Sequence, residues 1–140
     1  MNEIFANLFE LWGVFYIETE NFSDQLYEYN IYTPIGWFLM ISCVVWMLLY
    51  YKLIDHVNFA RWYHWLIWLV LLCLINFGFA YYWSTTELEF HFQEANGGEP
   101  PYSGEYVNFS LVIVLYTAIF GIIWSLIFKR FAINTKTTPF

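Results

Sequence analysis

The stretch WYHWLIWLVLLCLINFGFAYYW, residues 62–83, contains no Asp, Glu, Lys or Arg. A helix needs about 20 such residues to cross a hydrocarbon core of roughly 30 Å. Two more stretches have the same character, PIGWFLMISCVVWMLLYY at 34–51 and VNFSLVIVLYTAIFGIIWSLIF at 107–128. All three lack the polar face that a helix of a soluble bundle turns to water. The sequence therefore predicts an all-α integral membrane protein with three transmembrane helices.

The composition also indicates that a lipid bilayer surrounds much of this chain. Hydrophobic residues make up 60% of the 140 residues and aromatic residues 25%, while charged residues make up only 12%. A single soluble domain of this length could not bury so much apolar surface. The chain has 12 acidic residues against 5 Lys and Arg, so its field would repel phosphates, and we expect no nucleic-acid partner.

The few basic residues indicate the orientation. Lys52 and Arg61 lie between the first two spans, and the other three, Lys129, Arg130 and Lys136, follow the last span. An excess of Lys and Arg marks cytoplasmic segments, so we expect an N-out/C-in protein, located in the bacterial inner membrane. Residues 1–33 and the loop 84–106 are then external, and the loop 52–61 and the tail 129–140 are cytoplasmic. Since no basic region or cleavage site precedes the first span, we expect it to be retained.

The N-terminal segment has the pattern of an amphipathic helix. Its apolar residues fall at positions 4, 5, 8, 11, 12, 15 and 16, which lie along one face. With Glu10 inside it, this segment is too short and too polar to span, so we expect an interfacial helix. Its apolar stripe would pack on the protein's own spans or on a partner subunit. Leu8, Trp12 and Phe15 are the candidate docking residues of this stripe.

The external loop begins with the alternating stretch STTELEFHFQ, residues 84–93. A period of two predicts a strand, and residues 105–107 could return beside it as a short β-hairpin. Glu87, Glu89 and His91 would share one face of the first strand, where they would form an acidic docking surface for a partner. One imidazole without a nearby Cys favours a solvated face over a metal site, so no metal is expected.

The spans offer little chemistry. No charged residue lies at mid-depth, and Cys43 and Cys73 do not form a C-x-x-C pair. Phosphate-binding loops, zinc-protease motifs and nucleophile elbows are absent from the sequence. We therefore expect no enzymatic activity and no cofactor.

Small and weakly polar residues do recur along two spans, where they would let helices approach closely or bond to one another. The predicted packing residues are Cys73, Asn76 and Ala80 on the second span and Thr117, Gly121 and Ser125 on the third.

These observations favour a structural or anchoring subunit that docks other subunits of a membrane complex through its external acidic and aromatic segments. The alternative is a homo-oligomer that forms a pore or acts as a membrane effector. In topology alone, the chain resembles the three-span holins of bacteriophages, which are also N-out and C-in with a basic tail such as KRFAINTKTTPF, residues 129–140. That resemblance implies self-assembly in the bilayer.

Overall fold

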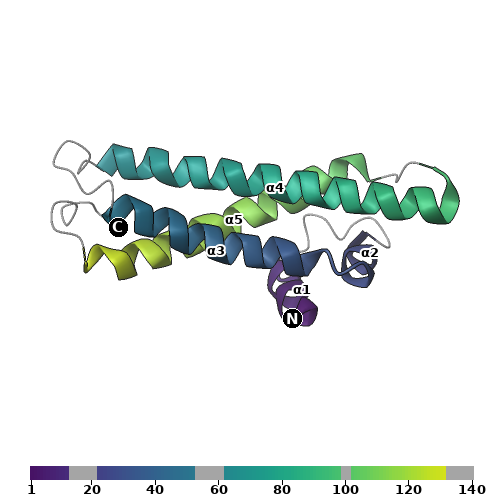
Figure 1. Cartoon of the computed structure of the whole chain (residues 1–140), viewed down its shortest axis with the longest axis horizontal. Coiled ribbons are helices and arrows are strands. Elements are labelled where there is room, and N and C mark those ends of the chain that lie inside the picture. The colour runs from purple at the N-terminus through teal and green to yellow at the C-terminus, as the bar shows by residue number, and fades with distance from the viewer. Residues whose placement is uncertain (13–21, 53–61, 99–101, 132–140) are drawn as a thin grey trace.

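The computed structural model describes residues 1–12, 22–52, 62–98 and 102–131, and all regular structure within them is helical. The helices are α1 (Asn2–Glu10), α2 (Phe22–Glu28), α3 (Tyr32–Lys52), α4 (Trp62–Asn96) and α5 (Ser103–Lys129). The three long ones run alongside one another as a bundle (Figure 1). Each is long and apolar enough to cross a membrane. This confirms the prediction of three such helices and indicates an integral membrane protein.

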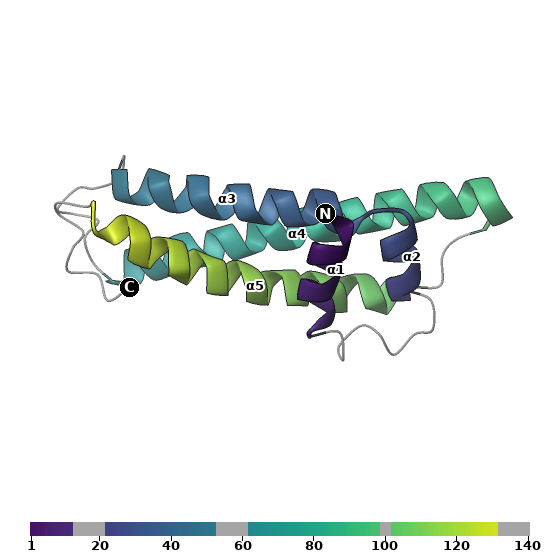
Figure 2. The ribbon, with the colours of Figure 1, turned by 90° about the horizontal axis from the view of Figure 1, so that it is seen from below.

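The helix α4 is longer than the bilayer requires. Its 35 residues extend over about 52 Å at 1.5 Å per residue, against roughly 30 Å of hydrocarbon. It begins at Trp62, where the second predicted span begins, but continues past Trp83 to Asn96. Figure 2 shows this second part extending beyond the ends of α3 and α5.

The predicted β-hairpin is wrong, because residues 84–93 continue α4 and residues 105–107 lie in the first turns of α5. The Ser84 and Thr85 hydroxyls donate to the carbonyl oxygens of Ala80 and Tyr81, four residues earlier, at 2.7 and 2.8 Å. These polar side chains therefore bond to the helix they sit in. Extending an existing helix adds one bond per residue fixed, whereas two isolated strands are marginally stable.

A tight turn joins α2 to α3. The backbone N–H of Ile31 donates to the Leu26 carbonyl and that of Asn30 to the Tyr27 carbonyl, at 3.0 and 3.1 Å. Asn30 has φ of 58°, the left-handed conformation that this helix-ending motif requires, and Asn tolerates it. Ile31 and Leu26 are both buried, which completes the motif with its apolar contact.

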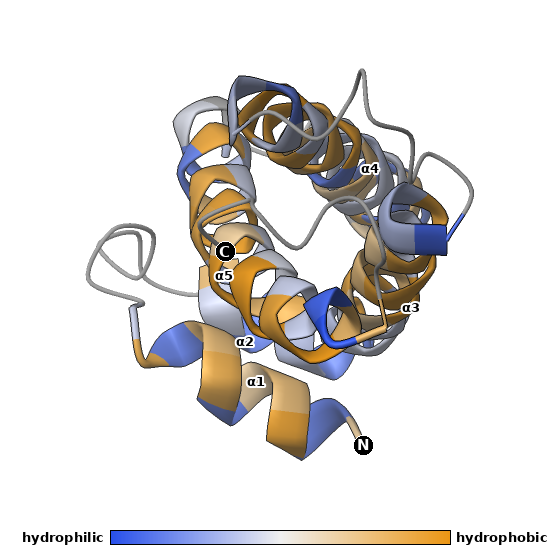
Figure 3. Cartoon of the chain, turned by 90° about the vertical axis from the view of Figure 1, so that its left-hand side faces the viewer, coloured by the Kyte–Doolittle hydropathy of each residue, from blue (hydrophilic) through white to orange (hydrophobic). Residues whose placement is uncertain are grey.

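The bundle has apolar residues on its outward as well as its inward faces (Figure 3). Large side chains such as Ile67, Leu74 and Leu111 are more than half exposed. In water such faces would drive aggregation, but lipid tails are as apolar as they are. This distribution is that of helices solvated by a bilayer.

Polar side chains join α3 to α4 inside the bundle. Asn76 is buried, and its amide donates to the Ser42 hydroxyl and to the Leu72 carbonyl, each at 3.1 Å. Nearer the other end, Trp46 and Trp68 each donate an indole N–H to the other's backbone carbonyl, at 2.9 and 3.0 Å. Their rings stack with centroids 4.5 Å apart. These paired bonds fix how the two helices are aligned along their axes.

Ser125 of α5 connects all three long helices. Its hydroxyl accepts the Trp65 indole N–H at 2.8 Å and shares a 2.6 Å hydrogen bond with the Tyr51 hydroxyl. Ser125 is fully buried, and Tyr51 and Trp65 are nearly so. Water cannot reach these buried groups and bond to them. The Ser125 hydroxyl instead bonds to one polar group from each of the two neighbouring helices.

We expect Ser125→Ala to lower the free energy of unfolding by about 1 to 3 kcal/mol, because it removes the hydroxyl to which both groups bond. Ser110→Ala is the matched control, since Ser110 is equally buried on α5 but its hydroxyl, within the described residues, bonds to the Tyr106 carbonyl of its own helix. Unfolding by dodecyl sulfate in mixed micelles measures both variants. Equal losses would contradict this role of Ser125.

Candidate functional site

The candidate site is a helical cap at one end of the bundle, consisting of α1, α2 and residues 84–96 of α4. α1 lies across the side of the bundle, roughly perpendicular to the long helices (Figure 2), and α2 packs beside it. The three long helices could cross a membrane without the cap. It also holds four of the six residues for which we predicted partner docking, namely Leu8, Glu87, Glu89 and His91.

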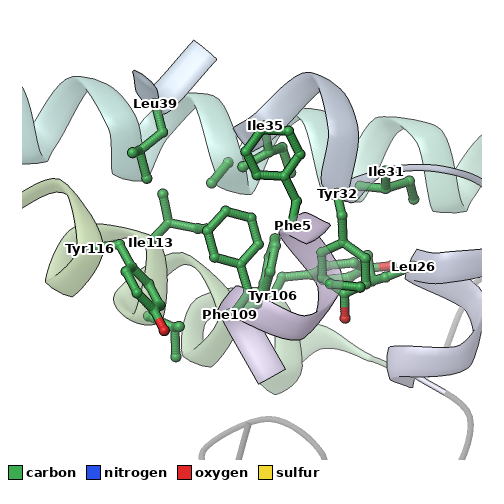
Figure 4. Packing of buried hydrophobic residues seen from close by; sticks show 14 of the residues in the cluster. Phe5, Leu26, Ile31, Tyr32, Ile35, Leu39, Tyr106, Phe109, Ile113 and Tyr116 are labelled. Carbon is green, nitrogen blue, oxygen red and sulfur yellow. The ribbon is translucent and has the colours of Figure 1, made fainter. Parts of the chain in front are cut away.

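An aromatic core fastens α1 to the spans. Phe9 is 1% exposed and lies within 6.3 Å, centroid to centroid, of the rings of Tyr32 on α3 and of Phe109 and Tyr116 on α5. The Tyr116 hydroxyl also donates to the Leu8 carbonyl. Figure 4 shows the side chains of this core meeting from α1, α3 and α5. Of the two surfaces left open by the sequence, the described part of α1 therefore packs on the chain's own spans.

Glycine at position 36 makes this contact close. A Cβ atom on Gly36 of α3 would overlap the ring of Phe5, which is itself buried. The Phe5 ring is stiff, so it cannot move aside as easily as the flexible end of an aliphatic side chain can. The packing of α1 on α3 thus depends on glycine at this position.

Hydrogen bonds connect α1 to α2 and to the start of α3. The Glu10 carboxylate accepts hydrogen bonds from the Ser23 hydroxyl at 2.6 Å and the Tyr32 hydroxyl at 3.4 Å. At the other end of α1, the Asn2 amide donates to the Tyr27 carbonyl at 2.8 Å. Both ends of this short helix are therefore held. Glu10, which argued against a span in the sequence, serves here as an acceptor.

A second aromatic group braces the projecting part of α4. Phe22 of α2 packs on Tyr102 at 5.2 Å, and Phe92 of α4 lies 5.9 Å from the same ring. The rings of Tyr29 and His91 stack at 4.1 Å with planes 6° apart. Burial raises the pKa of the Tyr102 phenol, which is neutral at pH 7 even at its ordinary value. α2 and the start of α5 thus hold residues 84–96 in place.

The helix separates the residues that a strand would have aligned. Glu87 and His91 face the same side and lie 3.9 Å apart, while Glu89, two residues from each, points about 200° from Glu87 around the helix. Leu88, between them, is fully buried. The predicted docking face of Glu87, Glu89 and His91 is therefore not one surface, and the imidazole is engaged by Tyr29.

The predicted docking residues of the N-terminal segment also have different environments. Leu8 is half-buried against the core, Trp12 is 46% exposed, and Phe15 lies outside the described residues. Sequence reasoning missed Phe90, which is 56% exposed on α4, because in the predicted strand it lies on the face opposite Glu87, Glu89 and His91. It also missed the bracing residues of α2, for which the aromatic density of residues 22–32 was the available signal.

Five of the six predicted helix-packing residues are buried in the bundle, and the sixth, Cys73, is partly buried. Asn76, Ala80, Thr117 and Ser125 are buried, and Cys73 is half-buried with its sulfur 4.0 Å from the Val114 carbonyl oxygen. A Cβ on Gly121 would come within 2.6 Å of a Leu69 methyl group. Within the described ranges, no three His, Cys, Asp or Glu side chains gather as a metal site would require.

Comparison of the chain with protein-family models, with curated proteins and with solved structures finds no match. What the protein does must therefore be argued from its own residues.

We expect Gly36→Ala to loosen α1, since a new methyl group must displace the Phe5 ring. Overpacking of this kind costs about 1 to 3 kcal/mol, which is at least fivefold in an opening equilibrium. The readout is the reaction rate of a cysteine placed at the buried Ala6 with an impermeant maleimide, in a chain without Cys43 and Cys73.

Gly78→Ala is the matched control, because a Cβ there meets nothing within 4 Å. We expect it to leave the labelling of position 6 unchanged. Fast labelling without any substitution at Gly36 would show that α1 does not rest on the spans.

Proposed function

We propose that this chain is a non-enzymatic anchoring subunit of a larger membrane complex, with its cap on the outer side of the membrane and the projecting part of α4 as the docking element. The observation that carries the proposal is the length of α4. Beyond Trp83, where the predicted span ends, its last turns add about 20 Å of helix. A chain that only had to remain in the bilayer would not need this projection or the two helices that brace it.

The projecting helix offers a surface that the cap does not cover. Phe90 is 56% exposed there, and Glu89 and Glu94 beside it on α4 are exposed as well. Aromatic side chains flanked by polar ones are the usual anchors of protein interfaces. Because Leu88, on the other side, is buried in the core, this face is held at a fixed angle before any partner arrives.

The acidic charge of the cap favours a partner with a basic surface. The sequence has no Lys or Arg before position 52 and none between 62 and 128, so side chains of the cap supply no fixed positive charge. Its exposed acidic residues are Glu3, Asp24, Glu28, Glu89 and Glu94. A partner with a basic rim around an apolar pocket would complement this surface, and opposite charges would guide the encounter.

We place α1 at the outer boundary between headgroups and acyl chains, as an interfacial helix. It meets α3 at Gly36 and α5 at Tyr116, both within the predicted spans. Ile4 of α1 is exposed, as are Leu11 and Trp12 just after this helix. Apolar side chains at this depth are stabilised by lipid. In the proposed inner-membrane, N-out/C-in arrangement, the basic ends of α3 and α5 lie in the cytoplasm.

Single cysteines test this orientation. In intact cells an impermeant maleimide should label cysteines at Asp24 and Glu94, which are exposed on the cap, and should not label one at Arg130 until the cells are opened. Labelling of position 130 alone would reverse the topology and move the cap into the cytoplasm.

The composition of the native particle tests the anchoring role. We expect the tagged chain, extracted gently from its own membranes, to retain other polypeptides in fixed ratio. The double variant Glu89→Lys with Phe90→Ser should lower that ratio more than tenfold, as loss of an interface anchor does. Glu28→Lys makes the same charge change on α2 and should lower it much less.

A particle of this chain alone, in a closed ring, would contradict the anchoring role and favour the pore-forming alternative. Equal losses from Glu28→Lys and the double variant would instead show that docking depends on the overall acidic field and not on the projecting face of α4.

A further inference from the structure

The end of the bundle opposite the cap contains a cavity of about 360 Å³ between α3 and α5, lined by Leu48, Tyr51, Lys52, Phe128 and Phe131. Four of these five residues offer carbon surface, and the fifth ends in an ammonium group. The cavity lies where two membrane-crossing helices reach the interface, because α3 ends at Lys52 and α5 at Lys129. It is thus accessible to lipid.

Tyr51 lines this cavity and is held by a hydrogen bond. Tyr51 is 4% exposed, and its hydroxyl is bonded to Ser125, which also accepts the Trp65 indole N–H. The phenol therefore has its hydrogen-bond partner and presents mainly the ring to the cavity. Lys52 remains as the polar group available to an occupant.

Among the described residues that line the cavities at this end, the charged ones are Lys52 and Arg130. Lys52 is exposed and, in the part of the chain that the structure describes, has no ion-pair partner. Arg130 lines a neighbouring cavity of about 370 Å³ with Leu126, Ile127 and Phe131. The two cavities share Phe131, which is 79% exposed and stands between them. Each thus combines apolar walls with one cation.

We propose that the cavity between α3 and α5 binds an anionic phospholipid. The phosphate lies against the Lys52 ammonium, and one acyl chain lies along Leu48 and Phe128. A soluble anion would gain nothing from the apolar walls, and a zwitterionic lipid would bring no net charge to the ammonium. Basic cavities between membrane helices on the cytoplasmic side select anionic headgroups for this reason. This binding is independent of the proposed docking role.

The test uses the full chain in nanodiscs of equal parts phosphatidylglycerol and phosphatidylcholine, with the lipids retained on the released protein counted by native mass spectrometry. We expect phosphatidylglycerol to be retained preferentially. Lys52→Gln should lower that preference about fivefold, which corresponds to the attraction of one basic residue to an anionic lipid surface. Lys129→Gln removes the same charge at the same end but lines neither cavity, so it should have little effect.

Leu48→Trp gives a second readout, because it fills the cavity without a change of charge. We expect it to reduce the number of retained phosphatidylglycerol molecules while Lys52 is still present. Equal retention of the two lipids by the unmodified chain would overturn the proposal. So would equal losses from Lys52→Gln and Lys129→Gln, since these would reflect a diffuse surface charge.

Discussion

The contact of Phe9 with α3 and α5 holds the cap and the spans together as one structure. This ring is 1% exposed and packs against aromatic rings of both α3 and α5. α1 has only nine residues, and a helix of that length is not stable alone in water. Its order must come from this packing and from the bonds of Asn2 and Glu10. Those bonds in turn hold α2, which braces α4.

The spans themselves follow a different physical rule. Between lipid-solvated helices there is little hydrophobic driving force, so close approach and hydrogen bonds determine the arrangement. Gly121 provides the close approach of α5 to α4, and Asn76 and Ser125 provide bonds between helices. The two ends of the bundle then differ in chemistry. One end carries the acidic cap, where we propose that a protein partner docks. The other carries Lys52 beside an apolar cavity, where we propose that a lipid binds.

The sequence predicted the spans well because their signal is strong. Long runs without charge have few alternatives, and each of the three runs lies in a helix long and apolar enough to cross a membrane. The segment 84–93 was predicted wrongly because a short alternating pattern also places Leu88 and Phe92 four residues apart on one helical face. The pattern alone fits a strand and a helix equally well. The segment is helical because it continues the long helix that precedes it.

The cap could be predicted only in part. The apolar stripe of α1 was visible, but the surface that it covers depends on Gly36 and Tyr116, which are distant in sequence. Glu87 and Glu89, which were predicted to share one docking face, lie on different sides of α4 because their segment is a helix and not a strand. Phe90, which carries the proposed docking, was hidden by the same error.

The most direct test of the central claim, that the cap is folded onto the spans without a partner, is hydrogen exchange of the isolated chain in lipid nanodiscs. Amides of residues 6–10 in α1 should exchange at least a hundredfold more slowly than in a free peptide of the same sequence. This protection would have to come from docking, because a nine-residue helix cannot provide it alone. Exchange at the rate of the free peptide would contradict the account and would make the cap dependent on a partner for its fold.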